Sequence, residues 1–372
     1  MNTIAYIGMD VHTTNYTLCA ISENSNNFYG RVTVPPEFKE LERYFKNLHE
    51  KKGITHFICG YEAGCLGYSL YYALTEHQWK GFSVECLVIA PTSLPMPKGG
   101  RIKTDTRDAL LLAQSMFNGT CSYVYIPDQS DEAAKEFIRM RDDTQQQLVQ
   151  TKLRINAMCL RQGYDYKEPS RWTQKHLEWL KKLQFKEKLF RETLDEYLFT
   201  LNQQTESVAR YDRRIEELAQ AKRYNERVRM LCCLKGIGVH TALSLLVEVG
   251  DFNRFPAAKN FSHYLGLVPG ENSSSTSTHR LGITKSGNNH LRWLLVEAAN
   301  CYSRGNGLKT KAMKAKQEGC PKEIIAYADR AALRLRKKYV RIQLRSKACI
   351  AKVAIARELA CFVWGMMTGH TA

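Results

Sequence analysis

The sequence predicts an α/β N-terminal domain, a long helical middle region and a mainly α-helical C-terminal domain. Short runs of β-branched and aromatic residues alternate with helical stretches over residues 1–90. Helix-forming residues then dominate, almost without Gly or Pro, from about residue 132 to about residue 229. Apolar helical stretches return at Met230 and continue to the end of the chain. A chain of 372 residues is too long for one small core, so we expect domains at residues 1–130, 131–229 and 230–372.

The N-terminal domain begins with three strand-like segments in quick succession. These are IAYIGMDV, YTLCAIS and the run around FYGRVTV, separated by clusters of Asn, Ser or Thr that favour turns. A helical stretch at residues 36–52 follows. HFICGYE and VECLVIA are then typical of buried strands, on either side of the helical segment GYSLYYALTEH. The order β-β-β-α-β-α-β-α predicts a mixed sheet covered by helices.

The middle region contains a heptad seam in its second half. Residues recur there in alternating steps of four and three, namely Phe190, Leu194, Tyr197, Leu201, Gln204, Val208, Tyr211, Ile215 and Leu218. This spacing predicts a coiled coil, within the chain or between copies, in which the polar Gln204 sets the register at some cost in stability. A long helix packed on its own domain explains the spacing equally well, and both alternatives stay open.

The chain carries a large positive charge, with 54 Lys and Arg against 37 Asp and Glu and a formal net charge of +17. Such a surplus attracts polyanions, so we expect DNA as the partner. A membrane partner is not expected, because the start MNTIAYIGMDVH lacks a basic stretch followed by an apolar run. No segment reaches the roughly 20 apolar residues of a membrane span. We expect a cytoplasmic, nucleoid-associated protein.

One helical stretch near the C-terminal end carries charge of a single sign. Between Asp329 and Glu358 there is no acidic residue, while ten basic residues accumulate. Solvated helix faces usually carry mixed charge, so this run favours a surface that contacts phosphates. The expected contacts are Arg334, Lys337, Lys338, Arg341 and Arg345.

Four acidic residues form the first candidate site. Asp10 and Glu62 each lie where a predicted strand ends, and carboxylates from two neighbouring strands would converge at one sheet edge. In KTDTRDALLLAQSM, Asp105 and Asp108 lie three residues apart, on one face of a helix that Thr104 caps. Each residue alone also has a plain structural explanation, because acids at a helix N-terminus complement the helix dipole.

The combination of the four acids favours a metal site over that explanation. Four carboxylates brought together would raise one another's pKa unless a cation compensates, and such hard oxygen ligands suit Mg²⁺. A pair of these ions can bind the attacking and leaving oxygens of a phosphodiester. Lys103 and Arg107, interleaved with the acids, are expected to contact the flanking phosphates.

A serine cluster forms the second candidate site. Polar loops such as GENSSSTSTHR, in the stretch from Gly266 to Gly287, are usually linkers. Here, however, the cluster has cationic or hydrogen-bonding neighbours, namely His279, Arg280, Lys285, His290 and Arg292. A serine that attacks phosphate needs such groups to stabilise its alkoxide and the transition state. Upstream, Gly236 and Gly238 open a helix and offer free N–H groups to a phosphate, although a helix hairpin whose turn needs glycine competes with that interpretation.

With these motifs in view, the chain resembles the insertion-sequence transposases of the IS110 family, the DEDD transposases related to Piv invertases. GMDVH, YEAG and KTDTRDA are similar to the family's acidic motifs, in the family's order. GLVPGENSSS, ITKSGN and LRWLLVEAA are similar to its C-terminal motifs. The resemblance spans essentially the whole chain. It implies an RNase H-like, RuvC-like N-terminal domain and a C-terminal transposase domain.

The resemblance also implies roles for residues and partners. The family's nucleophilic serine falls on Ser274, with Ser273 and Ser275 as alternates because Ser275 replaces the glycine that follows in the family pattern. The implied cofactor is Mg²⁺ or Mn²⁺. The implied partners are donor and target DNA, a structured guide RNA and further copies of the chain in dimers or tetramers. The acidic domain of one protomer would face the serine domain of another.

The function that follows is a site-specific DNA recombinase that cuts and joins strands. One rival is a metal-dependent nuclease of Holliday-junction-resolvase type, in which water attacks and the serine segment only binds DNA. A second rival is a non-catalytic nucleic-acid-binding protein whose acids cap helices and balance charge.

Overall fold

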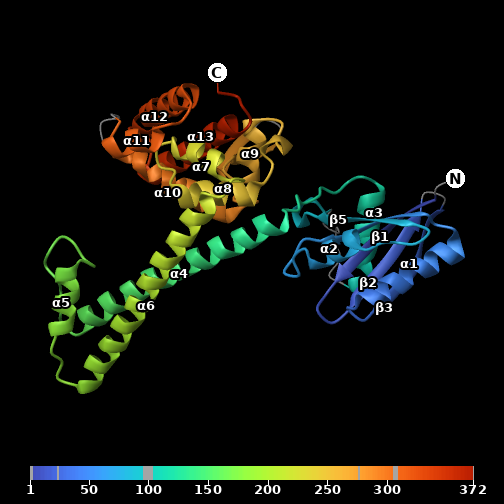
Figure 1. Ribbon diagram of the computed structural model, residues 1–372, viewed down its shortest axis with the longest axis horizontal. Coiled ribbons are helices and arrows are strands. Elements are labelled where there is room, and N and C mark those ends of the chain that lie inside the picture. The colour runs from blue at the N-terminus through green and yellow to red at the C-terminus, as the bar shows by residue number, and fades with distance from the viewer. Residues whose placement is uncertain (1–2, 23–24, 95–103, 275–276, 305–308, 372) are drawn as a thin grey trace. The chain divides into compact units, whose positions relative to one another are not determined.

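The computed structural model describes residues 3–22, 25–94, 104–274, 277–304 and 309–371. The chain forms two compact units, Met1–Ile126 and Pro127–Ala372 (Figure 1). Residues 131–229, expected as a separate domain, lie in the second unit together with the residues that follow them. The division into three domains therefore stays a prediction. Among the described residues, every helix is too short or too polar to cross a membrane.

The first unit is built around a five-stranded mixed sheet. Its strands are β1 (Ile4–Val11), β2 (Tyr16–Ser22), β3 (Ser25–Val34), β4 (His56–Glu62) and β5 (Ser83–Ile89), in the order β3-β2-β1-β4-β5. β1 is antiparallel to β2 and parallel to β4, and β5 is parallel to β4. The helices are α1 (Phe38–Lys52), α2 (Ser69–Glu76) and α3 (Asp105–Phe117), with a short 3₁₀ turn at Pro91–Ser93. This arrangement confirms the expected mixed α/β organisation and fits an RNase H-like domain.

Helices pack on both faces of this sheet, because successive side chains of a strand point to opposite sides. Ile7 of β1 belongs to the core that contains Phe45 of α1 and Leu74 of α2. Tyr6, the preceding residue, packs in the cluster that contains Leu112 of α3. α3 therefore covers the face opposite to α1 and α2.

α3 lies in direct contact with the backbone of the sheet. A Cβ atom on Gly8 of β1 would lie 1.9 Å from the carbonyl oxygen of Ala109 in α3. Gly60, the register partner of Gly8 on β4, leaves room for Met116, whose Sδ would lie 2.4 Å from such an atom. The two glycines therefore create the space that α3 occupies.

The second unit contains a pair of long helices, α4 (Gln129–Arg161) and α6 (Lys188–Ala219), with α5 (Gln174–Lys182) at the far end of the pair (Figure 1). Leu194, Leu201 and Val208 of the heptad seam are buried in one cluster with residues of α4. Gln204 Oε1 accepts a hydrogen bond of 2.9 Å from Thr151 Oγ1 of α4. The seam thus packs against α4 of the same chain, and a coiled coil with another copy stays a prediction.

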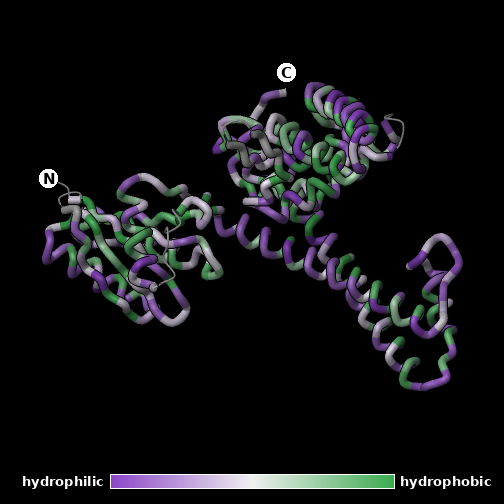
Figure 2. The backbone as a smooth tube through the Cα atoms, turned by 180° about the vertical axis from the view of Figure 1, so that it is seen from behind, coloured by the Kyte–Doolittle hydropathy of each residue, from purple (hydrophilic) through white to green (hydrophobic). Residues whose placement is uncertain are grey.

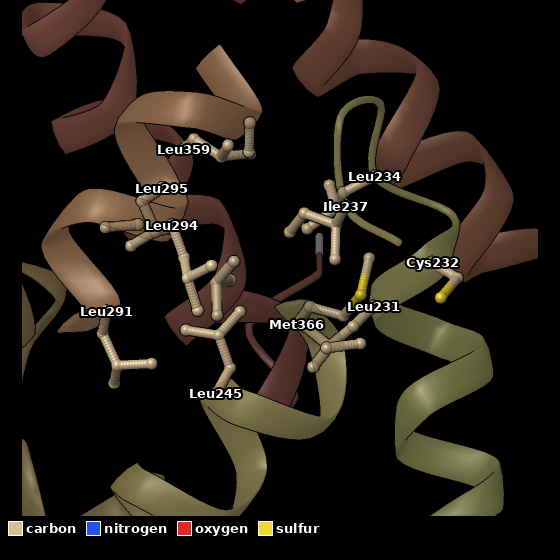
Figure 3. Close-up of a cluster of buried hydrophobic side chains, with 14 of the residues drawn as sticks. Leu231, Cys232, Leu234, Ile237, Leu245, Leu291, Leu294, Leu295, Leu359 and Met366 are labelled. Carbon is tan, nitrogen blue, oxygen red and sulfur yellow. The ribbon is translucent and has the colours of Figure 1, made fainter. Parts of the chain in front are cut away.

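The remaining helices form a lobe with its own core. They are α7 (Asn225–Cys232), α8 (Val239–Val249), α9 (Ala258–Tyr264), α10 (Asn289–Ala299), α11 (Lys311–Gln317), α12 (Lys322–Gln343) and α13 (Ala348–Met367), with 3₁₀ turns at Phe252–Arg254 and Asn300–Ser303. Leu231, Leu245, Leu295 and Leu359 meet in this core from α7, α8, α10 and α13 (Figure 3).

Hydrophobic and hydrophilic residues alternate along α4 and α6 (Figure 2), as amphipathic helices require.

The polar stretch expected as a loop between Gly266 and Gly287 forms a β-hairpin instead. Its strands are β6 (Pro269–Ser274) and β7 (Ser277–Ile283), which are antiparallel. The strands satisfy each other's backbone hydrogen bonds, but the serine-rich β6 has no apolar face. The apolar alternation that reveals most strands is therefore missing from its sequence.

Candidate functional site

The first two acidic residues lie at one edge of the sheet. β1 and β4 are parallel neighbours with Met9 opposite Tyr61, so Asp10 and Glu62 occupy the next position on each strand. Burial of Met9 and Tyr61 anchors both strand ends in the core. The two acids therefore lie at adjacent positions on neighbouring strands. The side chain of Glu62 is exposed.

The other two acids lie in the first turn of α3. Thr104 caps this helix, because its Oγ1 accepts a hydrogen bond of 3.4 Å from the backbone N–H of Arg107. One ligand atom each from Asp10, His12 and Asp105 lies within 4.8 Å of the others. Asp108 is half-buried and lies close enough for its charge to act on Asp10. The first unit thus brings Asp10 and Asp105 together beside Asp108, while Glu62 stands on the adjoining strand outside this close group.

The electrostatics of Asp10 are those of a crowded acidic site. Burial raises the pKa of its carboxyl group above the ordinary value. The charge of His12 opposes this rise, and the charges of Asp105 and Asp108 add to it. Oδ2 of Asp10 is buried and, within the described residues, accepts no hydrogen bond of good geometry, although His12 Nε2 lies 3.3 Å away. A buried carboxylate oxygen whose polar neighbour His12 is poorly aligned, and which lies among further carboxylates, fits a divalent cation.

His12 is a member of this group that the sequence reasoning missed. It lies two residues after Asp10, so both side chains point to the same side of the chain as β1 ends. The Asp-x-His spacing in GMDVH was the available signal. Of the two cations expected beside the acids, Arg107 is exposed in the first turn of α3, and Lys103 lies outside the described residues.

The serines lie at the end of the hairpin. Ser274 is the last residue of β6 and pairs with Ser277, and Ser273 pairs with Thr278. Ser275 lies outside the described residues. Arg280 stands farther along β7, opposite Glu271. The sequence reasoning placed a serine cluster in a loop, and the structure places two of its members on a strand.

The base of the hairpin is built by the residues that follow β7. The amide of Lys285 donates to the carbonyl of Gly266, and Lys285 adopts a left-handed φ of 57° with its side chain exposed. Arg292 Nη1 donates to the carbonyl of Leu265 at 2.9 Å, so its guanidinium braces this base. His290, expected as a helper of the serine, is instead enclosed by buried carboxylates.

The two glycines before α8 differ in their surroundings. Gly236 has a φ of +93°, and a Cβ atom there would lie 2.3 Å from the carbonyl oxygen of Ala298. Close packing against α10 therefore explains this glycine without a phosphate. Gly238 is the N-cap of α8, and a Cβ atom there would meet nothing within 4 Å. Only Gly238 has open space beside it for a ligand.

The basic helix α12 carries cations of two kinds. Arg334 and Lys338 pair with Glu358 of α13, which is buried. Lys337 and Arg341 are exposed and line the same groove, which has a volume of about 540 Å³. Arg345 is also exposed and follows the C-terminal end of α12. One buried acid therefore orders two cations of this groove beside others that face solvent.

Comparison with known proteins decides the family. A Sinorhizobium fredii protein named as a transposase is 31% identical over 368 residues, which cover 97% of this chain and 88% of that protein. The chain belongs to the IS110 family of transposases. Residues 228–314 match the family described as "Transposase IS116/IS110/IS902 family", and residues 7–164 match a family described as "Transposase" and named for IS110 and the DEDD motif.

Other relatives agree with the IS110 assignment. The transposase for insertion sequence element IS1533 of Leptospira borgpetersenii is 29% identical over 351 residues, 92% of this chain and 97% of that protein. The pilin gene-inverting protein of Moraxella bovis is 25% identical over 305 residues, 81% of this chain and 83% of that protein. As an IS110-family member, the protein is a DNA transposase that carries out strand transfer, and the DEDD family implies a divalent metal.

Proposed function

We propose that this transposase joins DNA strands through a serine–DNA intermediate and a four-acid metal site. Asp10, Glu62, Asp105 and Asp108 would bind Mg²⁺, with Mn²⁺ as the alternative, and Ser274 would attack the phosphodiester. The convergence of Asp10 and Asp105 from β1 and α3, with Asp108 beside them, carries the metal part of this proposal. The position of Ser274 at the end of β6 supports the serine part.

The chemistry is a balanced exchange of ester bonds. The serine oxygen forms a bond to phosphorus, the bond from phosphorus to a deoxyribose oxygen breaks, and that oxygen takes up the proton released by the serine hydroxyl. A divalent ion would supply positive charge to the phosphate oxygens in the transition state. The hydroxyl of the second strand then attacks the same phosphorus, the bond from phosphorus to the serine oxygen breaks, and the serine oxygen takes up the proton that this hydroxyl releases. Because each step exchanges one phosphate ester for another, no high-energy cofactor is required.

The remaining expectations also belong to this proposal. Lys103, Arg107, Gly238, Arg280, Lys285, Lys337, Arg341 and Arg345 are proposed to contact nucleic acid. Gly236, Arg292, Arg334 and Lys338 were expected in this role too, and their contacts within the protein account for them without DNA. We further propose a structured guide RNA and an assembly of two or four copies in which acidic and serine domains of different protomers meet.

Trapping a covalent adduct on nicked DNA tests the serine assignment. We expect the unmutated protein to form a protein–DNA adduct that Ser274→Ala abolishes, while Ser273→Ala and Ser275→Ala serve as matched controls and retain it. Adduct loss in a control but not in Ser274→Ala would move the nucleophile to that serine. Cleavage without any adduct from the unmutated protein would favour the nuclease rival.

The metal site is tested in the same assay. We expect Asp10→Asn and Asp105→Asn to lower the adduct rate by about 100-fold or more while DNA binding persists, because each variant removes a negative ligand from a charged site. Retained strand transfer in both variants would remove the metal site from the proposal. The family assignment already decides against a non-catalytic binding protein.

The guide RNA is tested by binding. We expect the transcript of the non-coding DNA beside the gene to bind more tightly than an unrelated structured RNA of the same length, measured at the same salt concentration. Equal affinity for both RNAs would contradict guidance and leave the strand-transfer proposal intact.

A further inference from the structure

A buried cluster of charges joins α4, α8 and α10 in the second unit. His290 of α10 lies between two carboxylates, with Nε2 2.7 Å from Asp142 Oδ2 and Nδ1 2.6 Å from Glu248 Oε1. The side chains of Asp142 and Glu248 are 3% and 2% exposed, and that of His290 is 13% exposed. Because both ring nitrogens face carboxylate oxygens, both donate, and the ring is a cation.

Further charges complete this group, which we call the His290 cluster: His290, Asp142, Glu248, Arg139 and Arg141. Arg139 donates two hydrogen bonds of 3.1 Å to Glu248, and Arg141 donates one of 3.0 Å to Asp142. Beyond the cluster, Arg141 also binds Asp212 of α6, and His240 of α8 lies 3.0 Å from Asp142. Arg139, Arg141 and His290 therefore face the carboxylates of Asp142, Glu248 and Asp212.

The cluster holds its carboxylates ionised. Burial alone would raise the pKa of Glu248, but hydrogen bonds from His290 and Arg139 lower it to about 2. Burial would likewise raise the pKa of Asp142, and its hydrogen bonds from His240 and His290 hold it below the ordinary value instead. Removal of the central cation would leave two buried negative charges without their shared partner.

The cluster is attached to the base of the serine hairpin. Asn288 is the N-cap of α10. Its side-chain Nδ2 donates to Glu248 Oε2 at 2.6 Å, and its backbone N–H donates to the carbonyl of Tyr264. Tyr264 precedes the segment that leads into β6, and Gly287 packs against its carbonyl so closely that a Cβ atom would lie 2.1 Å away. The chain entering the hairpin and the chain leaving it are therefore both connected to Glu248.

Apolar packing alone could attach α10 to its neighbours. α8 and α10 already share the large core of the lobe, and buried ion pairs often stabilise no more than apolar residues of the same size would. Hydrogen bonds donated by both ring nitrogens of His290, and the two-bond contact from Arg139 to Glu248, constrain orientation more than apolar contacts do, because they permit only one arrangement of the groups. The cluster is therefore suited to fix the orientation of α10 relative to α4 and α8.

We propose that the His290 cluster positions the serine hairpin on α4 for strand transfer, with His290, Glu248 and Asp142 as positioning residues that do not touch DNA. This inference rests on the proposed function, because it gives the hairpin a catalytic task. It adds a structural requirement to that function: the long helix α4 and the serine segment keep one relative orientation while the serine reacts. Both elements belong to the second unit.

The test compares His290→Gln with a variant that lowers stability without changing the His290 cluster. Leu359→Ala, in the apolar core of the same lobe, is the matched control, and both proteins are studied at a temperature where each is fully folded. We expect His290→Gln to form the covalent adduct about 10- to 100-fold more slowly at saturating nicked DNA, as displaced reacting groups do, with unchanged DNA affinity. Equal slowing by Leu359→Ala at an equal loss of Tm would reduce the cluster to a stabilising role and overturn the proposal.

A second variant and a second readout keep the proposal testable if His290→Gln does not fold or if no adduct exists. Arg139→Lys keeps the charge but loses the two-bond contact, and we expect slower adduct formation from it as well. Amide hydrogen exchange at Thr284, Lys285 and Asn288 reports the hairpin base directly, since each donates to the segment from Tyr264 to Val268. Exchange at these amides should accelerate more in His290→Gln and in Arg139→Lys than in Leu359→Ala. Equal exchange would overturn the positioning role, whereas a missing adduct in the unmutated protein would count against the serine mechanism alone.

Discussion

Gly8 has no side chain, and this absence determines where Asp105 and Asp108 of α3 can lie. The acids of α3 reach Asp10 only because α3 lies against the backbone of β1, and the absence of a Cβ atom at Gly8 permits that approach. A Cβ atom on its partner Gly60 would meet the flexible thioether of Met116 first, with Sδ at 2.4 Å, while the nearest backbone atom, the carbonyl oxygen of Leu87, is farther away at 3.2 Å. The two glycines therefore tolerate substitution differently.

We expect Gly8→Ala to destabilise the first unit by about 1–3 kcal/mol or more, because the added methyl group forces α3 away from the sheet. The same shift should weaken divalent-ion binding, measured by calorimetry. Gly60→Ala is the control, and it should cost less because Met116 can change its side-chain conformation. Equal costs for both variants would show that α3 is not seated by Gly8.

His290 predicts a pH dependence of stability with a definite sign. Burial alone would lower the pKa of this imidazole, but hydrogen bonds to Asp142 and Glu248 raise it from 6.5 to about 9. The folded state therefore keeps a proton that the unfolded chain loses, and the stabilisation is complete below pH 6.5 and lost as pH rises through about 9. Linkage sets an upper bound of about 3 kcal/mol on this effect.

Urea unfolding of the unmutated protein and of His290→Gln between pH 6 and pH 10 measures this dependence. The difference in the free energy of unfolding between the two proteins should shrink across that interval. A difference that stays constant would mean that His290 is not the titrating group.

At the residue scale, motifs predicted some of the site and missed the parts that depend on long-range packing. Asp10 and Asp105 stood out because acids at a strand end and in a helix first turn have local chemical meaning. Glu248 and Asp142 carry no such local pattern, since His290, the partner that they share, lies 42 and 148 positions away from them. In the sequence Gly8 looks like an ordinary strand glycine, and its role becomes visible only from the contact with the backbone of α3.

The hairpin β6–β7 could not be predicted from the sequence. Its serine-rich composition is typical of a loop, and only pairing between its two strands makes it regular. The long helices were easier to predict, because the heptad spacing of α6 survives in the structure as its contact with α4. The spacing could not say whether the partner helix lay in the same chain.

For α12, we expect charge removal to have different effects on different turns. Lys337→Ala and Arg341→Ala should each weaken DNA binding and make the slope of log K against log salt shallower by about 0.9 for each phosphate that is no longer neutralised. Arg336→Ala removes the same charge, but its guanidinium donates to the carbonyl of Tyr302 at 2.7 Å, so it should mainly reduce stability. Equal salt slopes for all three variants would contradict DNA binding by the exposed face.

At the scale of the whole molecule, the chain divides into two units with separate cores. The sheet of the first unit is packed by residues before 127, and the clusters of the second unit begin at Ala134. Alternation of strand-like and helical segments predicted the α/β start, and the run of helix-forming residues almost without Gly or Pro predicted the helical remainder. The expected boundary near residue 230 separates the arm, which is formed by α4 and α6, from the lobe. The two parts share one core, because Ile138 of α4 and Ile215 of α6 pack among the residues of the lobe.

This division predicts that ligands stabilise one unit at a time. A divalent ion should raise the unfolding temperature of the first unit by binding only its folded form. Hydrogen exchange during heating measures both units in one protein, and Asp10→Asn should remove the effect. An increase in protection confined to the second unit, or one that persists in Asp10→Asn, would contradict the assignment of the metal to Asp10.

The hydrogen bond between Gln204 and Thr151 has a consequence for how the arm formed by α4 and α6 can change in length. The amide finds this hydroxyl at one alignment of the two helices only, and sliding α6 by seven residues toward the tip would bring it to Met158 in the apolar core. We therefore expect insertions or deletions between this pair and the tip of the arm to come in whole heptads and in both helices together, because only then does the apolar seam keep its register. The length of the arm is then expected to change in steps of seven residues, with α4 and α6 changing together.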